Sequence, residues 1–170
     1  MARLLDIPIH DDETFLQACD CLHDATFKED DVSDSASGEL KIILEREYFE
    51  DRELIEESKT WFPGFFRARY PLVRSKLVLT GIRSITRKGP RRYKQTDFLE
   101  ARIKKNHYHL LAPPVTWVIE FSNGPQGSLQ DMEILAKRRT AIQFTPLGCL
   151  AAVGVVLLGI GIAVLLSYVW

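Results

Sequence analysis

Val115-Thr116-Trp117-Val118-Ile119-Glu120-Phe121 is the stretch of sequence that indicates most clearly how this chain folds. Large apolar side chains stand at every second position, Val115, Trp117, Ile119 and Phe121. Successive side chains of a strand point to opposite faces of a sheet, so this alternation predicts a β-strand with one buried face. Prolines precede the stretch, and Ser-Asn-Gly-Pro at residues 122–125 predicts a turn after it.

The same period of two recurs on the N-terminal side of this strand. Further strands are predicted at residues 40–45, 73–86, 99–103 and 107–111. Residues 104–106 predict a hairpin tip. Residues 50–59 are charged and predict a short surface helix or a loop, whereas residues 129–135 predict a last strand or a helix. Consecutive strands without helices between them imply antiparallel pairing.

One amphipathic helix is predicted before the strands. Phe15, Ala18, Cys19 and Leu22 fall at i, i+3, i+4 and i+7 and form one apolar stripe. The acidic residues 11–13 favour the positive N-terminal end of such a helix. The predicted fold class is therefore α+β. An N-terminal helix packs on a mostly antiparallel sheet, either a meander or a barrel-like sandwich, and one C-terminal transmembrane helix follows.

The prediction of a transmembrane helix rests on residues 147–170, which contain no charged side chain. At about 1.5 Å per residue, a helix of this length reaches roughly 36 Å, more than the hydrocarbon core of about 30 Å. Tyr168 and Trp170 suit the far membrane interface. The alternative is a buried core helix, but such helices rarely run past about 18 apolar residues.

The orientation of this span is predicted from Lys137, Arg138 and Arg139, which precede it, while no cation follows it in the sequence. The positive-inside rule then places the preceding domain in the cytoplasm. Asp6 and Pro8 interrupt the first apolar residues, which therefore do not read as a signal peptide. The expected parts are a cytoplasmic soluble α+β domain at 1–136, a basic juxtamembrane linker at 137–146 and a transmembrane helix at 147–170.

Charge is distributed very unevenly along the chain. Residues 1–60 carry a net charge of −12 and residues 61–170 one of +11. One interpretation is that the cations lie on solvated strand faces and are balanced by the acidic first third. The other is contact with anionic headgroups or an acidic partner. A membrane tether and the acidic half argue against nucleic acid. The expected membrane or partner contacts are Arg87, Lys88, Arg91, Arg92, Lys137, Arg138 and Arg139.

Four residues are candidates for a metal site. Cys19 and His23 would share one helix face, and His107 and His109 would share one strand face. The alternative interpretation makes Cys19 a core residue and places the two strand histidines on a solvated face. No cofactor is expected. The sequence contains no Gly-x-Ser-x-Gly elbow, phosphate-binding glycine loop or His-Glu-x-x-His, so no catalytic residue is assigned and enzymatic activity is unsupported.

The apolar tail carries a pattern of its own. Gly159, Ala163 and Ser167 recur every four residues, a small-x3-small series that allows two helices to approach closely in lipid. Such a series also arises by chance, because glycine is common in membrane helices. The expected partners are membrane lipid and either other membrane subunits or a second copy.

Taken together, these features predict a single-pass, C-terminally anchored membrane protein. Its cytoplasmic domain would serve as an interaction module, such as an accessory subunit of a membrane complex. The alternative function is that of a small membrane-bound enzyme or of a ligand- or metal-binding sensor.

Overall fold

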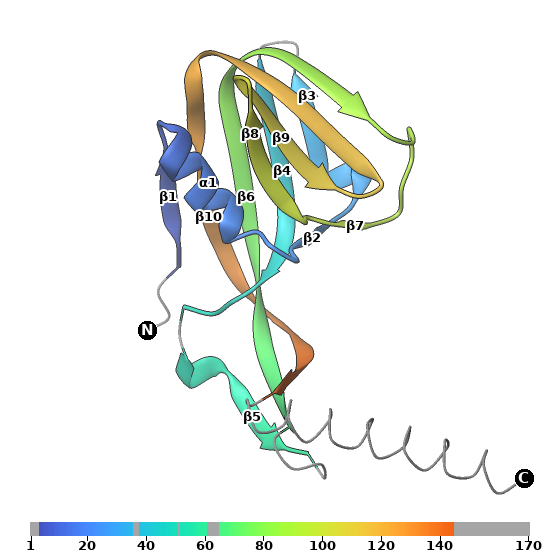
Figure 1. Cartoon of the computed structure of the whole chain (residues 1–170). Coiled ribbons are helices and arrows are strands. Elements are labelled where there is room, and N and C mark those ends of the chain that lie inside the picture. Colours follow the sequence, from blue (N-terminus) through green and yellow to red (C-terminus); the bar gives the residue numbers. More distant parts are fainter. Residues whose placement is uncertain (1–3, 36–37, 51, 61–64, 145–170) are drawn as a thin grey trace, which may run out of the picture. The chain divides into compact units, whose positions relative to one another are not determined.

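The computed structural model describes residues 4–35, 38–50, 52–60 and 65–144. Most of them belong to one antiparallel sheet with a single α-helix (Figure 1). The chain divides into two compact units: unit 1 is Met1–Asp51 with Pro71–Lys137, and unit 2 is Arg52–Tyr70 with Arg138–Trp170. The expected span at 147–170 lies outside the described residues. Within them, no helix combines the length and the hydropathy that crossing a membrane requires.

Ten strands, one α-helix and two short 3-10 helices follow one another along the described chain. In order they are β1 (Asp6–Ile9), α1 (Asp12–Asp20), β2 (Thr26–Phe27), η1 (Glu29–Asp31), β3 (Val32–Ser35), β4 (Glu39–Glu47), η2 (Arg52–Leu54), β5 (Glu56–Lys59), β6 (Phe65–Lys88), β7 (Thr96–Asp97), β8 (Glu100–Lys104), β9 (His107–Ala112) and β10 (Val115–Phe144).

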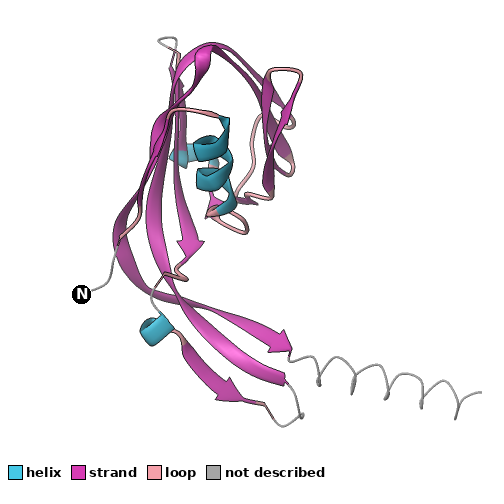
Figure 2. Ribbon diagram, turned by 60° about the vertical axis from the view of Figure 1, so that its left-hand side comes forward, coloured by secondary structure: helices cyan, strands magenta, loops and turns pink. Residues whose placement is uncertain are grey.

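In unit 1 the sheet curls into a half-barrel (Figure 2). The strand order is β7-β2-β4-β6-β10-β9-β8, so β7 and β8 stand at opposite ends although they are neighbours in sequence. The chain between them reaches both ends of the sheet. The backbone N–H of Phe98 donates to the oxygen of Ala25 at 2.7 Å, and that of Leu99 donates to Leu111 in β9 at 2.8 Å. The predicted mostly antiparallel sheet is therefore confirmed, and its observed form is a curled half-barrel.

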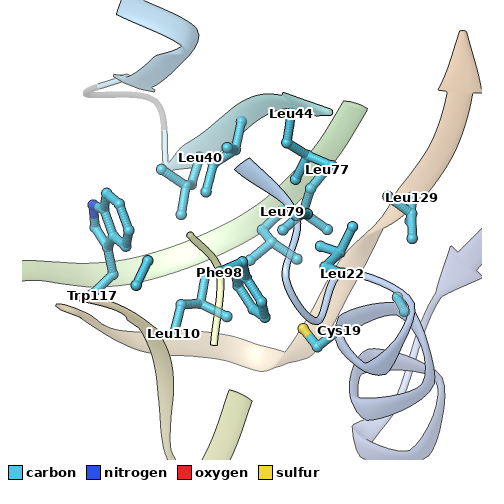
Figure 3. Packing of buried hydrophobic residues seen from close by; sticks show 14 of the residues in the cluster. Cys19, Leu22, Leu40, Leu44, Leu77, Leu79, Phe98, Leu110, Trp117 and Leu129 are labelled. Atoms are coloured by element: carbon cyan, nitrogen blue, oxygen red, sulfur yellow. The ribbon is translucent and has the colours of Figure 1, made fainter. Parts of the chain in front are cut away.

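Helix α1 packs against this sheet as its apolar stripe predicted. Phe15, Ala18, Cys19 and Leu22 are all buried. The ring of Phe15 lies edge-on to Tyr108 of β9, with centroids 5.2 Å apart. Around the stripe, core side chains of the strands and Phe98 of the β7–β8 connection fill the interior. Figure 3 shows them for Leu40, Leu44, Leu77, Leu79, Phe98, Leu110, Trp117 and Leu129.

The start of α1 is fixed by side chains that satisfy free backbone N–H groups. Asp11 caps the helix and accepts a hydrogen bond from the N–H of Thr14 at 2.8 Å. The hydroxyl of Thr14 accepts in return from the N–H of Asp11 at 3.1 Å. This reciprocal arrangement is a capping box. The Thr14 hydrogen bonds hold the pKa of the exposed Asp11 carboxyl below its usual value.

The predicted turn at residues 122–125 is wrong, because β10 continues through it to Phe144. Gly124 and Gly127 take φ angles of +85° and +152° inside this strand. Glycine adopts such angles without a Cβ penalty, so the chain can bend there without ending the strand. A Cβ at Gly127 would collide with the Val78 carbonyl of β6, so the residue also permits close strand approach.

Three other segments contain strand residues. Residues 50–59 contain strand β5 as well as the short helix η2. Residues 129–135, for which the sequence predicts a strand or a helix, belong to strand β10. Residues 137–144 of the expected linker form the last part of the same strand. The hairpin tip at 104–106 is confirmed, since β8 and β9 pair directly across it and Lys105 and Asn106 adopt positive φ.

Candidate functional site

A buried ionic cluster lies on the core side of unit 1. Arg46 of β4 occupies the same strand face as the core residue Leu44, and only 1% of its side chain is exposed. Its Nη2 donates to Asp131 Oδ2 of β10 at 2.7 Å, and its Nε donates to the other carboxylate oxygen at 3.2 Å. Ser75 of β6 donates to Asp131 Oδ1 at 2.6 Å. Three neighbouring strands therefore meet at one carboxylate.

The cluster also holds the chain just before β1. Asp131 Oδ2 accepts from the N–H of Leu5 at 2.8 Å, and the N–H of Asp131 donates to the Leu5 carbonyl at 2.9 Å. Arg46 Nη1 donates to Glu50 Oε1 at 2.8 Å. Burial alone would lower the pKa of the Arg46 guanidinium, but Asp131 and Glu50 outweigh it and raise that pKa.

Every buried side-chain polar atom in the described part of the chain has a hydrogen-bond partner. The charges of the buried ionic cluster are therefore satisfied from within the fold, and its evident effect is to tie strands together. Burial has the largest effect on the pKa of the Cys21 thiol, and the positive charge of Arg46 acts in the opposite direction. Burial nevertheless raises the pKa of the Cys21 thiol, opposite to the shift that activates a nucleophilic cysteine.

The structure does not bring the four metal candidates together into one site among the described residues. Cys19 is buried in the core, where burial raises the pKa of its thiol. His23 is exposed and lies 3.0 Å from the Asp24 carboxylate. His107 and His109 lie on the face of β9 opposite to that of Tyr108, which packs on α1.

His107 instead meets the sheet's outer side chains. Its Nε2 lies 2.8 Å from Glu120 Oε1 of β10, and its Nδ1 lies 2.9 Å from the carbonyl oxygen of Lys105. No group of three or more His, Cys, Asp or Glu among the described residues is placed to hold a metal ion.

The basic turn, residues 87–94, is the densest positive surface of unit 1. Its five cations are Arg87, Lys88, Arg91, Arg92 and Lys94, and no acidic residue stands among them. All five are exposed, and within the described residues none of them forms an ion pair. The turn thus presents net positive charge to solvent.

The turn is also fixed in place. Arg87 Nη2 donates to the carbonyl oxygens of Pro90 and Arg91 at 2.9 and 3.1 Å. The same guanidinium stands 5.5 Å from the centre of the Tyr93 ring. A Cβ at Gly89, whose φ is +122°, would collide with the Pro114 carbonyl, so the turn lies directly on the β9–β10 connection. A surface held in this way loses little freedom on binding.

Acidic residues lie on one side of the basic turn. Glu29 Oε2 accepts from the N–H of Tyr93 at 3.3 Å. Glu29 and Asp30 line a hollow of about 420 Å³ together with Arg92 and Lys94. Lys88 and Arg91 do not line this hollow, so the least compensated charge belongs to the first part of the turn.

Other cations of the basic region are paired with the acidic first third of the chain. Arg74 of β6 lies 3.9 Å from Glu45 of β4, and Lys137 lies 3.6 Å from the same carboxylate. In unit 2, Arg138 Nη2 lies 3.4 Å from Glu56, and Arg138 also donates to the Leu54 carbonyl at 2.7 Å. All three expected juxtamembrane cations therefore have interactions within the chain. Gly159, Ala163 and Ser167 lie outside the described residues.

The periodicity of apolar residues does not predict the buried ionic cluster, because each of its members is polar. A signal was nevertheless present. Arg46 continues the spacing of Leu40, Ile42 and Leu44, and Ser75 stands between Val73 and Leu77 at core positions. A polar side chain at a core position of two adjacent strands predicts a buried hydrogen-bonded partner.

Comparison with known proteins adds no further constraint to these assignments. No protein-family model matches the chain, and neither a curated protein nor a solved structure is detectably similar to it.

Proposed function

We propose that this chain is a single-pass, C-terminally anchored membrane protein whose cytoplasmic domain is an interaction module, an accessory subunit of a membrane complex. The basic turn is its contact surface, and an acidic surface of another subunit is its partner. The observation that carries the proposal is the exposed, rigidly held run of five cations without an ion pair in the described chain. The charge-free tail at 147–170 supports the anchor.

The pairing of charges elsewhere strengthens this choice of surface. Where β4 and β6 run side by side, glutamates offset the cations, as the balanced-face interpretation predicts. Over most of its length, the basic turn has no glutamates in the described chain that offset its cations in this way. An exposed charged surface favours recognition through electrostatic attraction, which speeds association and selects partners of opposite charge.

Recovery of the full-length chain from its own membranes in mild detergent tests the proposal. We expect a stoichiometric partner to be recovered at low salt and to be lost as salt rises, because about 0.1 M salt screens exposed charges beyond about 10 Å. Lys88→Ser, Arg91→Ser and Arg92→Ser together should abolish recovery. Arg87 is left intact because it holds the turn in place.

A matched control removes the same number of charges elsewhere in unit 1. Lys76→Ser, Arg83→Ser and Lys104→Ser together should leave recovery of the partner unchanged. Equal recovery with both triple variants would show that the basic turn is not the contact surface. A wild-type chain that binds phosphatidylserine vesicles through the basic turn, and recovers no subunit, would assign the turn to lipid instead.

A further inference from the structure

The three strand segments of unit 2 form a short ribbon with a distinct end. Lys59 of β5 pairs with Phe66 of β6, and Glu56 pairs with Arg69. β6 also pairs with β10, where Gln143 Nε2 donates a hydrogen bond to the Tyr70 hydroxyl. Contacts in unit 1 show that β10 runs antiparallel to β6, since Glu133 meets Arg74 and Asp131 meets Ser75. Because the two strands are antiparallel, the C-terminal end of β10 at Phe144 and the N-terminal end of β6 at Phe65 lie at the same end of the ribbon.

Charged side chains are distributed unevenly along this ribbon: acidic residues lie in its middle, and the charged residues described at its end are all cations. In its middle, Glu56 lies between two cations, 3.2 Å from Arg69 and 3.4 Å from Arg138. Beyond Glu57, Ser58 pairs with Arg67 and Lys59 pairs with Phe66, and none of these four residues is acidic. Neither Lys59 nor Arg67 has an ion pair among the described residues.

Apolar side chains accompany the free cations at this end. Phe65 and Phe66 are half-buried and point to opposite faces of β6. Ile142 near the end of β10 is 58% exposed. Aromatic rings beside lysine and arginine are the combination that membrane interfaces favour, since the rings lie at the level of the headgroups and the cations meet phosphate.

The length of the chain keeps this end close to the expected span. Leu147 follows Gln143 by four residues, which reach at most about 14 Å. Phe66 precedes Tyr70, the partner of Gln143, by four strand residues, or about 13 Å. From the contact between Tyr70 and Gln143, β6 toward Phe66 and β10 toward Phe144 run to the same end of the ribbon. The ribbon end and the start of an inserted tail would therefore stand at similar depth.

We propose that the ribbon end, defined as Lys59, Phe65, Phe66, Arg67 and Ile142, lies in the headgroup layer of the membrane that the tail enters. Its aromatic rings occupy the interface, and its two cations bind lipid phosphate. This inference rests on the proposed anchor. It makes unit 2 a second lipid contact beside the tail, whereas the basic turn of unit 1 stays free for an acidic protein surface.

A fluorescent probe on the full-length chain tests the depth of the ribbon end. The carrier is the chain with Cys21→Ser and Cys149→Ser, which leaves only the buried Cys19. The probe is attached in Ser58→Cys, next to the ribbon end, or in Ser84→Cys as the control. Both serines are exposed strand residues, and Ser84 belongs to unit 1. The chains are placed in vesicles of phosphatidylcholine and phosphatidylserine with a nitroxide on the headgroup of some lipids.

We expect severalfold quenching of the probe at position 58 and none at position 84. Changing Lys59, Phe65, Phe66 and Arg67 to Ser in the same chain should restore the fluorescence at position 58. Lys76→Ser and Arg83→Ser should not restore it. Equal quenching at both positions would overturn the inference, because the whole domain would then lie on the lipid.

Flotation of the same samples separates the two proposals. A chain that floats with the vesicles but shows no quenching at position 58 retains the anchor and overturns the role of the ribbon end. A chain that does not float overturns both proposals.

Discussion

Arg46 and Asp131 carry buried charges in contact with three strands and with the residue before β1. Removing one member of such a pair leaves the other charged and poorly solvated. We therefore expect Asp131→Asn to lower the free energy of unfolding by about 3–5 kcal/mol. Denaturant titration of the full-length chain in detergent measures this change.

Glu133→Gln is the matched control, because Glu133 forms a 2.8 Å ion pair with Arg74 but its side chain is 55% exposed. Exposed pairs contribute about 1 kcal/mol or less. Similar losses for the two variants would mean that Asp131 is not the charge on which the buried ionic cluster depends.

Tyr108 provides a pH-dependent contribution to stability. Its hydroxyl donates to Asp12 Oδ1 at 2.6 Å, and burial together with this hydrogen bond raises its pKa from 10.0 to about 12. The folded chain thus holds the phenolic proton more tightly than the unfolded chain does. Stability from this group is present below pH 10 and is lost as the pH rises toward about 12.

Unfolding of Tyr108→Phe at about pH 9 and about pH 11 checks this expectation. The variant loses the hydrogen bond to Asp12 at both pH values, yet its stability should fall less between them than that of the wild-type chain. An identical fall in the two proteins would assign the alkaline loss to other groups.

At the scale of elements, periodicity predicted the helix and the longer strands of unit 1, but not the short strands β1, β2, β3 and β7. The helix stripe at Phe15 and the alternation in β4, β9 and the first part of β10 depend on side chains that point toward or away from one core. The continuation of β10 past residue 122 could not be predicted, because its bend uses Gly124 and Gly127, which are also typical turn residues.

The candidate site was predictable only in part. The five cations of the basic turn are adjacent in sequence, so their clustering needed no fold to be visible. The contacts that hold the turn, such as Gly89 against Pro114, depend on pairing between distant strands. Separation of Cys19 from His107 likewise follows from which face of β9 meets α1.

Of the two β10 glycines, Gly127 should tolerate substitution by alanine less well than Gly124. In Gly127→Ala the new Cβ would meet the Val78 carbonyl, a backbone group that cannot rotate away. In Gly124→Ala nothing lies within 4 Å of that Cβ, so only the positive φ is penalised, at about 1–2 kcal/mol. Thermal unfolding should show the greater loss for Gly127→Ala, and the opposite order would contradict the close approach of β6 and β10.

At the scale of the whole molecule, the tail and the described strands are expected to be separable. A chain ended after Phe144 keeps all of β10 and should appear folded in the soluble fraction. The near-ultraviolet dichroism of the buried Trp117 reports its folding. Retention of this chain on membranes washed with high salt would contradict the tail as the main anchor.

The hydrogen bond between Leu5 and Asp131 joins residues 126 positions apart and has a consequence for synthesis. At about 5–20 residues per second, a ribosome needs roughly 6–25 s to pass from the first to the second. A local hairpin closes in about 1–10 μs. β1 therefore leaves the ribosome long before β10 can pair with it, and Phe15 waits similarly for Tyr108 and Phe121. During that interval the apolar stripe of Phe15, Ala18, Cys19 and Leu22 lacks the strands that bury it in the folded chain.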